Sequence, residues 1–217
     1  MASFDQNKPL RFSMSQAATT STCYRLLIVA ATLLLAGCTP TTLVVPIRYL
    51  PQTNVQPIPG AESASLAVQV KDLRSNQADI GTDALPLRTY EVTTNDNLAE
   101  AVRSAIQIEL QDRGFKIGTG SAALLIQING MDSERRIGWF YENSARTVFM
   151  MQVQVARKNG KIIYTHEAVG ERGESYIEAH YSVGAAERVT NLAIQDCIQR
   201  LFTDPKFIDA LLNANKP

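Results

Sequence analysis

The sequence has few of the residues from which metal sites and disulfides are built, and it lacks the common nucleotide and hydrolase motifs. It has three cysteines, two histidines and one tryptophan in 217 residues. His166 and His180 are distant from each other in the chain, and two such histidines make a poor zinc set. No Gly-x-x-x-x-Gly-Lys phosphate loop and no Gly-x-Ser-x-Gly elbow is present. The apolar run between Arg25 and Cys38 is too short to span a bilayer core of about 30 Å.

That apolar run has the order of a bacterial signal peptide: a cation, an apolar core, small residues and a cysteine. Its ending, Leu35-Ala36-Gly37-Cys38, resembles the lipobox of bacterial lipoproteins. The resemblance implies cleavage before the cysteine, two acyl groups such as palmitate on its thiol, and a third on the new amino terminus. We therefore expect residues 1–37 to be a lipoprotein signal peptide and Cys38 to be the lipidation site. The alternative is an ordinary secretory leader that is cut near Ala36.

Removal of residues 1–37 leaves 180 residues, a size suited to one domain. The leader holds three of the 21 basic residues and one of the 21 acidic ones, so the mature chain has 18 basic and 20 acidic residues. This balance does not favour binding to nucleic acid. If Cys38 is acylated, Cys197 is the only remaining thiol and no internal disulfide can form.

A proline-rich segment follows the lipobox. Five prolines within residues 39–63 forbid a continuous helix and disfavour central strands. We therefore divide the mature chain into a tether, residues 38–63, and a folded domain, residues 64–217. Leu43, Val44, Val45 and Ile47 leave a second interpretation open, in which part of the tether lies along the domain as an edge segment.

Alternation of apolar and polar residues predicts strands at 65–70, 124–128, 149–155 and 162–166, and a short one at 90–93. Asn159-Gly160 between two of them predicts a hairpin with a type I′ turn. Residues 76–89 and 132–144 are interpreted as loops. Residues 171–181 are polar and show no clear period.

Helical periodicity covers residues 98–113 and 183–202, and a shorter helix follows Asp204-Pro205. Asn97 is placed to cap the first helix, and Gly114 to end it. Strands in runs with helices set apart predict an α+β fold. We expect an antiparallel sheet of about four to five strands with two main helices packed on one face.

The order of these features resembles the YajG-like lipoproteins of Gram-negative bacteria. The shared features are the lipobox, a proline-rich tether, a strand near Asp72-x-Arg74, a helix that ends in Arg113-Gly114-Phe115, an Asn-Gly hairpin and a late helix. The resemblance implies an outer-membrane lipoprotein with a small periplasmic α/β domain. It implies no activity and no site residue except Cys38. In the bacterial sorting rule, Thr39 rather than Asp after the cysteine favours the outer membrane.

The best candidate for partner binding is a predicted loop with two arginines and three consecutive aromatic residues. It consists of Arg135, Arg136, Trp139, Phe140 and Tyr141. Tryptophan, tyrosine and arginine are favoured at interface hot spots, so a protein or glycan contact is one interpretation. The other, which we favour, is that the rings fold back over the sheet edge or the tether.

The remaining candidates favour structural roles. His166-Glu167 lacks the second histidine of a His-Glu-x-x-His metal helix, and no metal or cofactor is expected. Asp72 and Arg74 fit a salt bridge or Asx turn better than a ligand site. Gly118-Thr119-Gly120 fits a tight turn, and Cys197 lies on the apolar face of its helix, away from the open setting of a reactive thiol.

These observations predict a non-catalytic, lipid-anchored protein of the outer membrane that faces the periplasm and binds an envelope protein or the cell wall. An accessory lipoprotein of an ABC-type lipid or solute transport system is a second hypothesis. A peptidoglycan-associated binder is a third, because residues 97–102 loosely resemble the helix of OmpA-like binders; the serine and arginine of that helix are absent. An enzyme is not expected.

Overall fold

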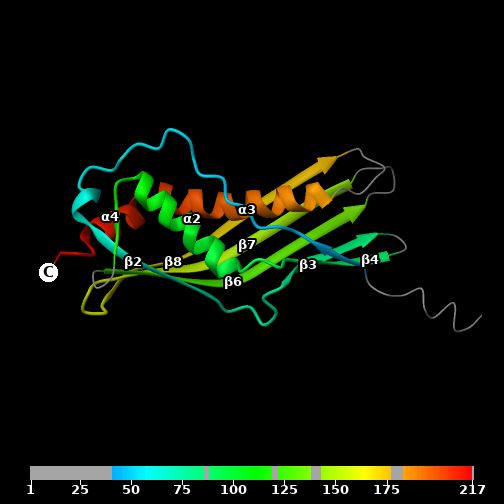
Figure 1. The fold of residues 1–217 in the computed structure, drawn as a ribbon, viewed down its shortest axis with the longest axis horizontal. Coiled ribbons are helices and arrows are strands. Elements are labelled where there is room, and N and C mark those ends of the chain that lie inside the picture. Colours follow the sequence, from blue (N-terminus) through cyan, green and yellow to red (C-terminus); the bar gives the residue numbers. More distant parts are fainter. Residues whose placement is uncertain (1–40, 86–87, 119–121, 138–142, 177–182, 217) are drawn as a thin grey trace, which may run out of the picture. The chain divides into compact units, whose positions relative to one another are not determined.

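The computed structural model describes residues 41–85, 88–118, 122–137, 143–176 and 183–216. Within these ranges the chain forms an eight-stranded mixed sheet and three α-helices. The helices α2 and α3 lie in front of the sheet in Figure 1. The α+β class is therefore confirmed, and the sheet is larger than the four to five strands expected from the sequence. Residues 1–40, which include the expected signal peptide and Cys38, lie outside the described ranges.

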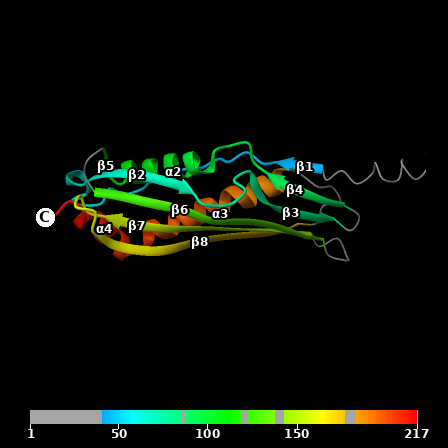
Figure 2. The same ribbon diagram turned by 90° about the horizontal axis from the view of Figure 1, so that it is seen from below.

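The long strand β6, Ala122–Ile137, organises the sheet. Along its length it pairs antiparallel with β7, Asn143–Ala156, and β7 pairs with β8, Ile162–Tyr176. These three strands run side by side in Figure 2. On its other side, the first half of β6 pairs in parallel with β2, Ser65–Asp72, and the last part with β3, Asp79–Leu85.

Three shorter strands complete the sheet. Strand β4, Arg88–Thr93, forms a hairpin with β3, and β1, Thr41–Val44, pairs in parallel with β4. Strand β5, Lys116–Ile117, pairs in parallel with β2. The expectation of an antiparallel sheet is therefore wrong in part. The connection from β2 to β6 contains α2, and a helical crossover returns the next strand in the same direction.

Two segments that we interpreted as loops are strands. Residues 76–89 contain all of β3 and the start of β4, and residues 132–144 contain the end of β6 and the start of β7. Ile80 of β3 is fully buried in a small second core with Leu43, Val45, Val92 and Ala186. So few buried apolar residues give only a weak period in the sequence.

The helices begin and end within a few residues of the positions that the sequence predicts. Helix α2 spans Leu98–Asp112, and the Asn97 side chain accepts a hydrogen bond from the Glu100 amide. At its end the Gly114 amide donates to the Gln111 carbonyl and the Phe115 amide to the Leu110 carbonyl, which is a Schellman motif. Helix α3 spans Val183–Thr203, and α4 spans Pro205–Asn213 with Asp204 as its N-cap.

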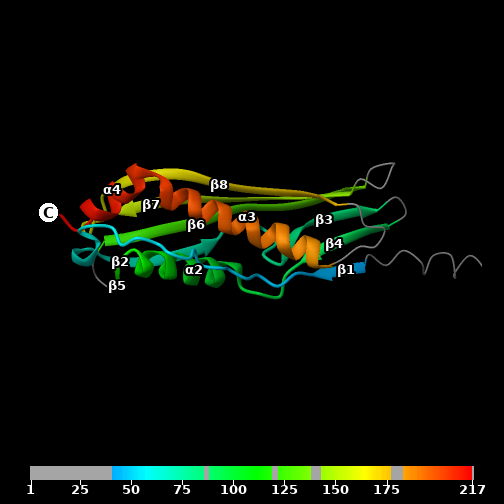
Figure 3. The same ribbon diagram turned by 90° about the horizontal axis from the view of Figure 1, so that it is seen from above.

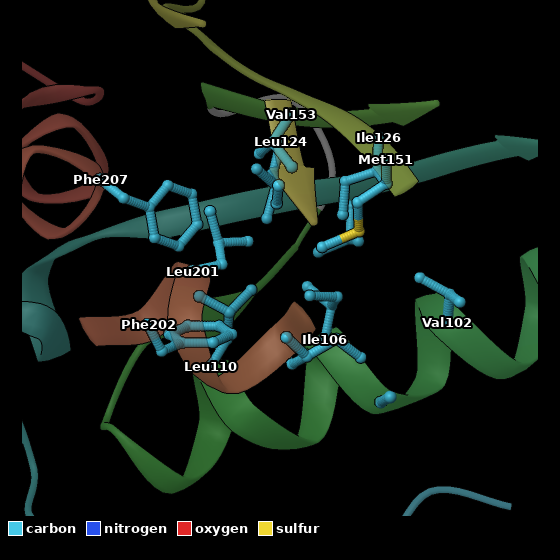
Figure 4. Close-up of a cluster of buried hydrophobic side chains, with 14 of the residues drawn as sticks. Val102, Ile106, Leu110, Leu124, Ile126, Met151, Val153, Leu201, Phe202 and Phe207 are labelled. Carbon is cyan, nitrogen blue, oxygen red and sulfur yellow. The ribbon is translucent and has the colours of Figure 1, made fainter. Parts of the chain in front are cut away.

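The main core lies between the helices and one face of the sheet. Figure 4 shows Val102, Ile106 and Leu110 of α2 directed toward Ile126 and Met151 of the sheet. Leu201 and Phe202 of α3 and Phe207 of α4 close the same cluster. We call this side of the sheet the helix-covered face.

The turn between β7 and β8 differs from the predicted type. The Arg157 amide donates to the Lys161 carbonyl and the Gly160 amide to the Arg157 carbonyl. Within this turn, Gly160 has a positive φ of 80° and Asn159 does not. A type I′ turn requires a positive φ at Asn159 as well. The hairpin is confirmed, and its loop is a type I turn followed by a left-handed glycine.

Residues 41–58 lie against the domain. Strand β1 pairs with β4, and the Ile47 amide donates 2.7 Å to the Asp96 carboxylate. The Arg48 amide donates to the Asn191 side chain of α3, which in turn donates to the Pro46 carbonyl. After β1, a short 3₁₀ helix, Ala61–Ser63, leads into β2. Of the two interpretations of this segment, the structure therefore supports the second. Residues 41–58 lie along the domain as an edge segment.

Candidate functional site

The start of β1 and the end of β6, which contains Arg135 and Arg136 of the predicted binding loop, lie at the same end of the sheet. Strand β6 ends there at Ile137, and β3, parallel to it, ends there at Leu85. Strand β4 runs the opposite way and begins there, as does β1, which is parallel to β4. Figure 3 shows β1, β3 and β4 together at this end. We call it the β1 end; Thr41 begins there, three residues after Cys38.

The predicted binding loop is divided between strand and undescribed residues. Arg135 and Arg136 belong to β6, where they pair with Ala145 and Ser144 of β7. Their assignment to a loop is therefore wrong, because β6 and β7 continue their ladder to Ile137 and Asn143. Trp139, Phe140 and Tyr141 lie outside the described residues. The described strands on either side of them have their ends at the β1 end, where Ile137 of β6 pairs with Asn143 of β7.

Asp72 and Arg74 form the structural pair that the sequence favoured. The Arg74 amide and guanidinium both donate to the Asp72 carboxylate, at 3.1 Å and at 2.8–3.2 Å. The same guanidinium donates to the carbonyls of Gln77 and Asp79. Both side chains are nearly buried. They close the β2–β3 connection and leave no free group for a ligand.

His166 and Glu167 are neighbours in β8 and therefore point to opposite faces of the sheet. The His166 ring lies 6.0 Å from that of Tyr164, on the helix-covered face. Among the described residues, no group of three or more histidine, cysteine or acidic side chains could hold a metal ion. His180 lies outside the described residues, as do Thr119 and Gly120.

Cys197 lies in the core, as predicted, where α3 crosses β8. Its side chain is fully buried, and burial raises the pKa of its thiol to about 12. The strand approaches the helix closely at Gly170, where an added Cβ would lie 2.1 Å from the Ala193 carbonyl oxygen. A thiol with this pKa is protonated at neutral pH and is not a nucleophile.

A buried ion pair joins Glu109 of α2 to Arg113, and no sequence pattern singles it out. The Glu109 carboxylate of α2 is fully buried and pairs with Arg113 one turn later. It also accepts a hydrogen bond of 2.5 Å from the Tyr49 hydroxyl, and Arg113 donates 3.0 Å to the Gln52 side chain. The Arg113 guanidinium lies 4.4 Å from the centre of the Phe202 ring. The Glu-x-x-x-Arg spacing was visible in the sequence, but it is equally common on exposed helix faces.

A groove of about 340 Å³ lies between the 41–58 segment and the first half of α3. Leu50 and Leu192 supply apolar surface, and Arg48 and Glu187 line it with an ion pair of 3.8 Å. No sequence pattern indicates this groove, because it depends on the packing of residues 41–58 against α3. Among the described residues, no helix is both long and apolar enough to cross a membrane.

Comparisons with known proteins found distantly similar solved structures and one matching family model. A crystal structure of a Xanthomonas campestris protein is 9% identical, with a TM-score of 0.46 over 75% of this chain and 92% of that one. A minor lipoprotein of Acinetobacter baumannii is 10% identical, with a TM-score of 0.43 over 76% of this chain and 96% of that one. No curated protein matches the chain. A family model described as uncharacterized lipoprotein matches residues 51–211. Because this match covers well over half of the sequence, the chain belongs to that family of uncharacterized lipoproteins.

Proposed function

We propose that this protein is a lipid-anchored protein of the outer membrane, facing the periplasm, whose domain binds an envelope partner and catalyses no reaction. The observation that carries the proposal is membership of a lipoprotein family together with Leu35-Ala36-Gly37-Cys38. The resemblance to YajG-like lipoproteins and the Thr39 sorting rule support the outer membrane. Three acyl chains on one residue make attachment effectively permanent, since one chain alone binds only reversibly.

The packing of residues 41–58 supports a domain held close to its membrane. Only Thr39 and Pro40 separate Cys38 from the first strand. Three residue steps span at most about 10 Å, so an anchor on Cys38 keeps the start of β1 within that distance of the acylated residue. A partner at the membrane surface would therefore meet the β1 end, where β6 ends before Trp139, Phe140 and Tyr141 in the sequence and β7 begins after them.

The buried ionisable groups of the described residues are engaged within the fold or protonated, which supports a binding role for the domain rather than a catalytic one. Asp72 is engaged by Arg74, and Glu109 by Arg113 and Tyr49. Burial raises the pKa of Cys197, and the Glu109 hydrogen bond adds to burial in raising that of Tyr49. Asp72, Glu109 and Tyr49 each form bonds within the fold, and the Cys197 thiol is buried in the core.

Metabolic labelling with radioactive palmitate tests the anchor. Wild-type protein should take up label and fractionate with the outer membrane, and Cys38→Ala should lose the label. Cys197→Ala is the matched control and should keep it, because that thiol is buried in the core. An unlabelled wild type, or a fully labelled Cys38→Ala, contradicts the proposal.

Photo-crosslinking in living cells from position 139 or 141, followed by mass spectrometry, tests partner binding. An envelope protein or peptidoglycan fragment captured from these positions, and not from Arg103 on α2, supports the proposal. Capture of a permease or a substrate-binding protein would instead assign the chain to a transport system. No adduct from any position at the β1 end would contradict partner binding there.

A further inference from the structure

The face of the sheet opposite the helices has no cover among the described residues. Successive side chains of a strand point to opposite faces of the sheet. Two ion pairs of β8 show which residues belong to which face. Arg172 reaches Asp196 of α3, whereas its neighbour Glu171 pairs with Arg146 of β7 on the other side. We call that other side the open face. Its residues in the central rows are partly or largely exposed.

One row of side chains crosses four strands of the open face in register. Lys71 of β2 pairs with Gln127 of β6, Gln127 with Gln152 of β7, and Gln152 with Glu167 of β8. The row thus has a cation at one end, an anion at the other and two amides between them. Its two halves are complementary in charge.

Lys71 and Glu167 cannot pair within one chain. Three strand spacings of about 4.8 Å separate them, about 14 Å in all. Both side chains are exposed, and neither has an ion-pair partner among the described residues. Each charge therefore remains available to a second molecule.

We propose that the open face binds a second copy of this chain, with a two-fold axis that runs parallel to the strands, midway between β6 and β7. Such an axis reverses the order of the strands across the interface and keeps each row opposite itself. Lys71 then lies over Glu167 of the second copy, and Gln127 over Gln152 of the second copy. Both contacts occur twice, as a two-fold interface requires.

Most polar side chains of the two central rows meet a polar partner in this arrangement, and the exception is Gln154, which meets Leu125 of the second copy. A glutamine amide both donates and accepts, so Gln127 and Gln152 of opposite copies satisfy each other where the sheets meet. The adjacent row, Gln69, Leu125, Gln154 and Thr165, places Gln69 over Thr165 of the second copy, which is again a polar pair. Two sheets can pack in this way at about 10 Å with nearly aligned strands.

The direction of the strands adds an independent argument, which rests on the proposed anchor. A two-fold axis parallel to the strands leaves the β1 ends of both copies pointing the same way. Both Thr41 residues, and hence both Cys38 anchors, then lie at one end of the dimer. Two copies held in one membrane can form this interface, whereas an axis across the strands would send the anchors in opposite directions.

The interface is small. Four strands and eight residues of each strand cover roughly 19 by 27 Å, or about 500 Å² of each copy. The total of about 1,000 Å² lies at the lower limit for a specific contact and indicates a reversible dimer. Attachment to one membrane raises the effective concentration of the second copy and favours the contact.

Disulfide trapping tests the geometry with the full-length protein in its membrane. Lys71→Cys with Glu167→Cys in one chain should give a dimer under mild oxidation, since these positions are too far apart for an internal bridge. Lys71→Cys alone should not dimerise, because two-fold symmetry does not bring it near its own copy. Arg103→Cys on α2 is the matched exposed control and should stay monomeric. Absence of the double-cysteine dimer, or equal dimer from Arg103→Cys, overturns the proposal.

Charge exchange tests the contact without cysteines. Lys71→Glu and Glu167→Lys should each weaken dimerisation roughly tenfold, because each places two like-charged contacts in the interface. The double exchange should restore it to within roughly twofold. A double exchange as weak as the single variants contradicts the pairing. Palmitate labelling of the same samples reports the anchor separately, so labelled protein without a dimer refutes only the interface.

Discussion

The Tyr49 hydroxyl donates a hydrogen bond of 2.5 Å to the Glu109 carboxylate, which joins two residues that are 60 positions apart. Tyr49 belongs to the proline-rich segment, and Glu109 is buried in α2 beside Arg113. The bond holds the segment nearest the proposed anchor to the centre of the domain. A force on the anchor would therefore reach the core through residues 41–58.

Glu109→Gln should lower the free energy of unfolding by about 3–5 kcal/mol, because it leaves the buried Arg113 guanidinium without its counter-charge. Tyr49→Phe should lower it by less, about 1.5–3 kcal/mol, since it removes one hydrogen bond to a charged group. Urea unfolding followed by circular dichroism measures both. Glu100→Gln, in the exposed pair with Arg103, is the control and should change stability by less than about 0.5 kcal/mol. A Glu109→Gln effect no larger than the control would refute the role of the pair.

Gly170→Ala should destabilise the fold by about 1–3 kcal/mol or more. An added Cβ would lie 2.1 Å from the Ala193 carbonyl and 2.6 Å from the Cys197 Cβ, so β8 and α3 must separate. Gly173→Ala in the same strand is the matched control, because the nearest atom to its Cβ is 3.6 Å away. Thermal unfolding of the two variants should differ clearly. Equal melting temperatures would show that the close approach at Gly170 is not required.

The Cys197 thiol should make stability fall at alkaline pH. Burial raises its pKa from the ordinary 9.0 to about 12, so the folded state keeps its proton where the unfolded state loses it. The stabilisation is complete below about pH 9 and is lost as the pH rises toward 12. At about pH 10.5 the loss should reach about 2 kcal/mol. Urea midpoints at neutral and alkaline pH measure it.

Cys197→Ala is the comparison for that experiment. The variant keeps every other titrating group, so the difference between its pH profile and that of the wild type isolates the thiol. Two parallel profiles would contradict the prediction. In the folded wild type, a maleimide should also react far more slowly with Cys197 than it does in urea.

Trp139→Ala combined with Phe140→Ala should change the free energy of unfolding by less than about 1 kcal/mol if these rings form a binding surface. Chemical denaturation of the double variant provides the measurement. A loss of several kcal/mol would show that the rings pack into the core, which is the interpretation that we favoured from the sequence.

The local structure could be predicted closely because its causes lie within a few residues. Asn97 and Asp204 begin their helices through their own side chains, and Gly114 ends α2. The apolar period of α3 places Cys197 in the core, and Asp72 reaches Arg74 two residues away. Each of these predictions required only a spacing that can be read along the chain.

The partners of the strands could not be predicted in the same way. Among the residues of β3 whose burial is described, 79–82, only Ile80 is buried, and the partners of this strand, β4 and β6, lie at different distances along the chain. The direction of β2 beside β6 depends on the crossover that contains α2. The candidate sites show the same limit. The sequence indicates Arg135 and Arg136 as candidates but predicts a loop where β6 continues. It gives no sign that Glu109 is buried.

By itself, the sequence determined the helices and their ends, the hairpin after β7, and the lipobox on which the proposed anchor rests. Only the tertiary structure decided the size and mixed direction of the sheet, the packing of residues 41–58, and the row from Lys71 to Glu167. The physical reason is the range of the interactions. Caps, turns and helical periods are satisfied within one or two turns of chain, whereas strand pairing and burial join residues that the sequence holds far apart.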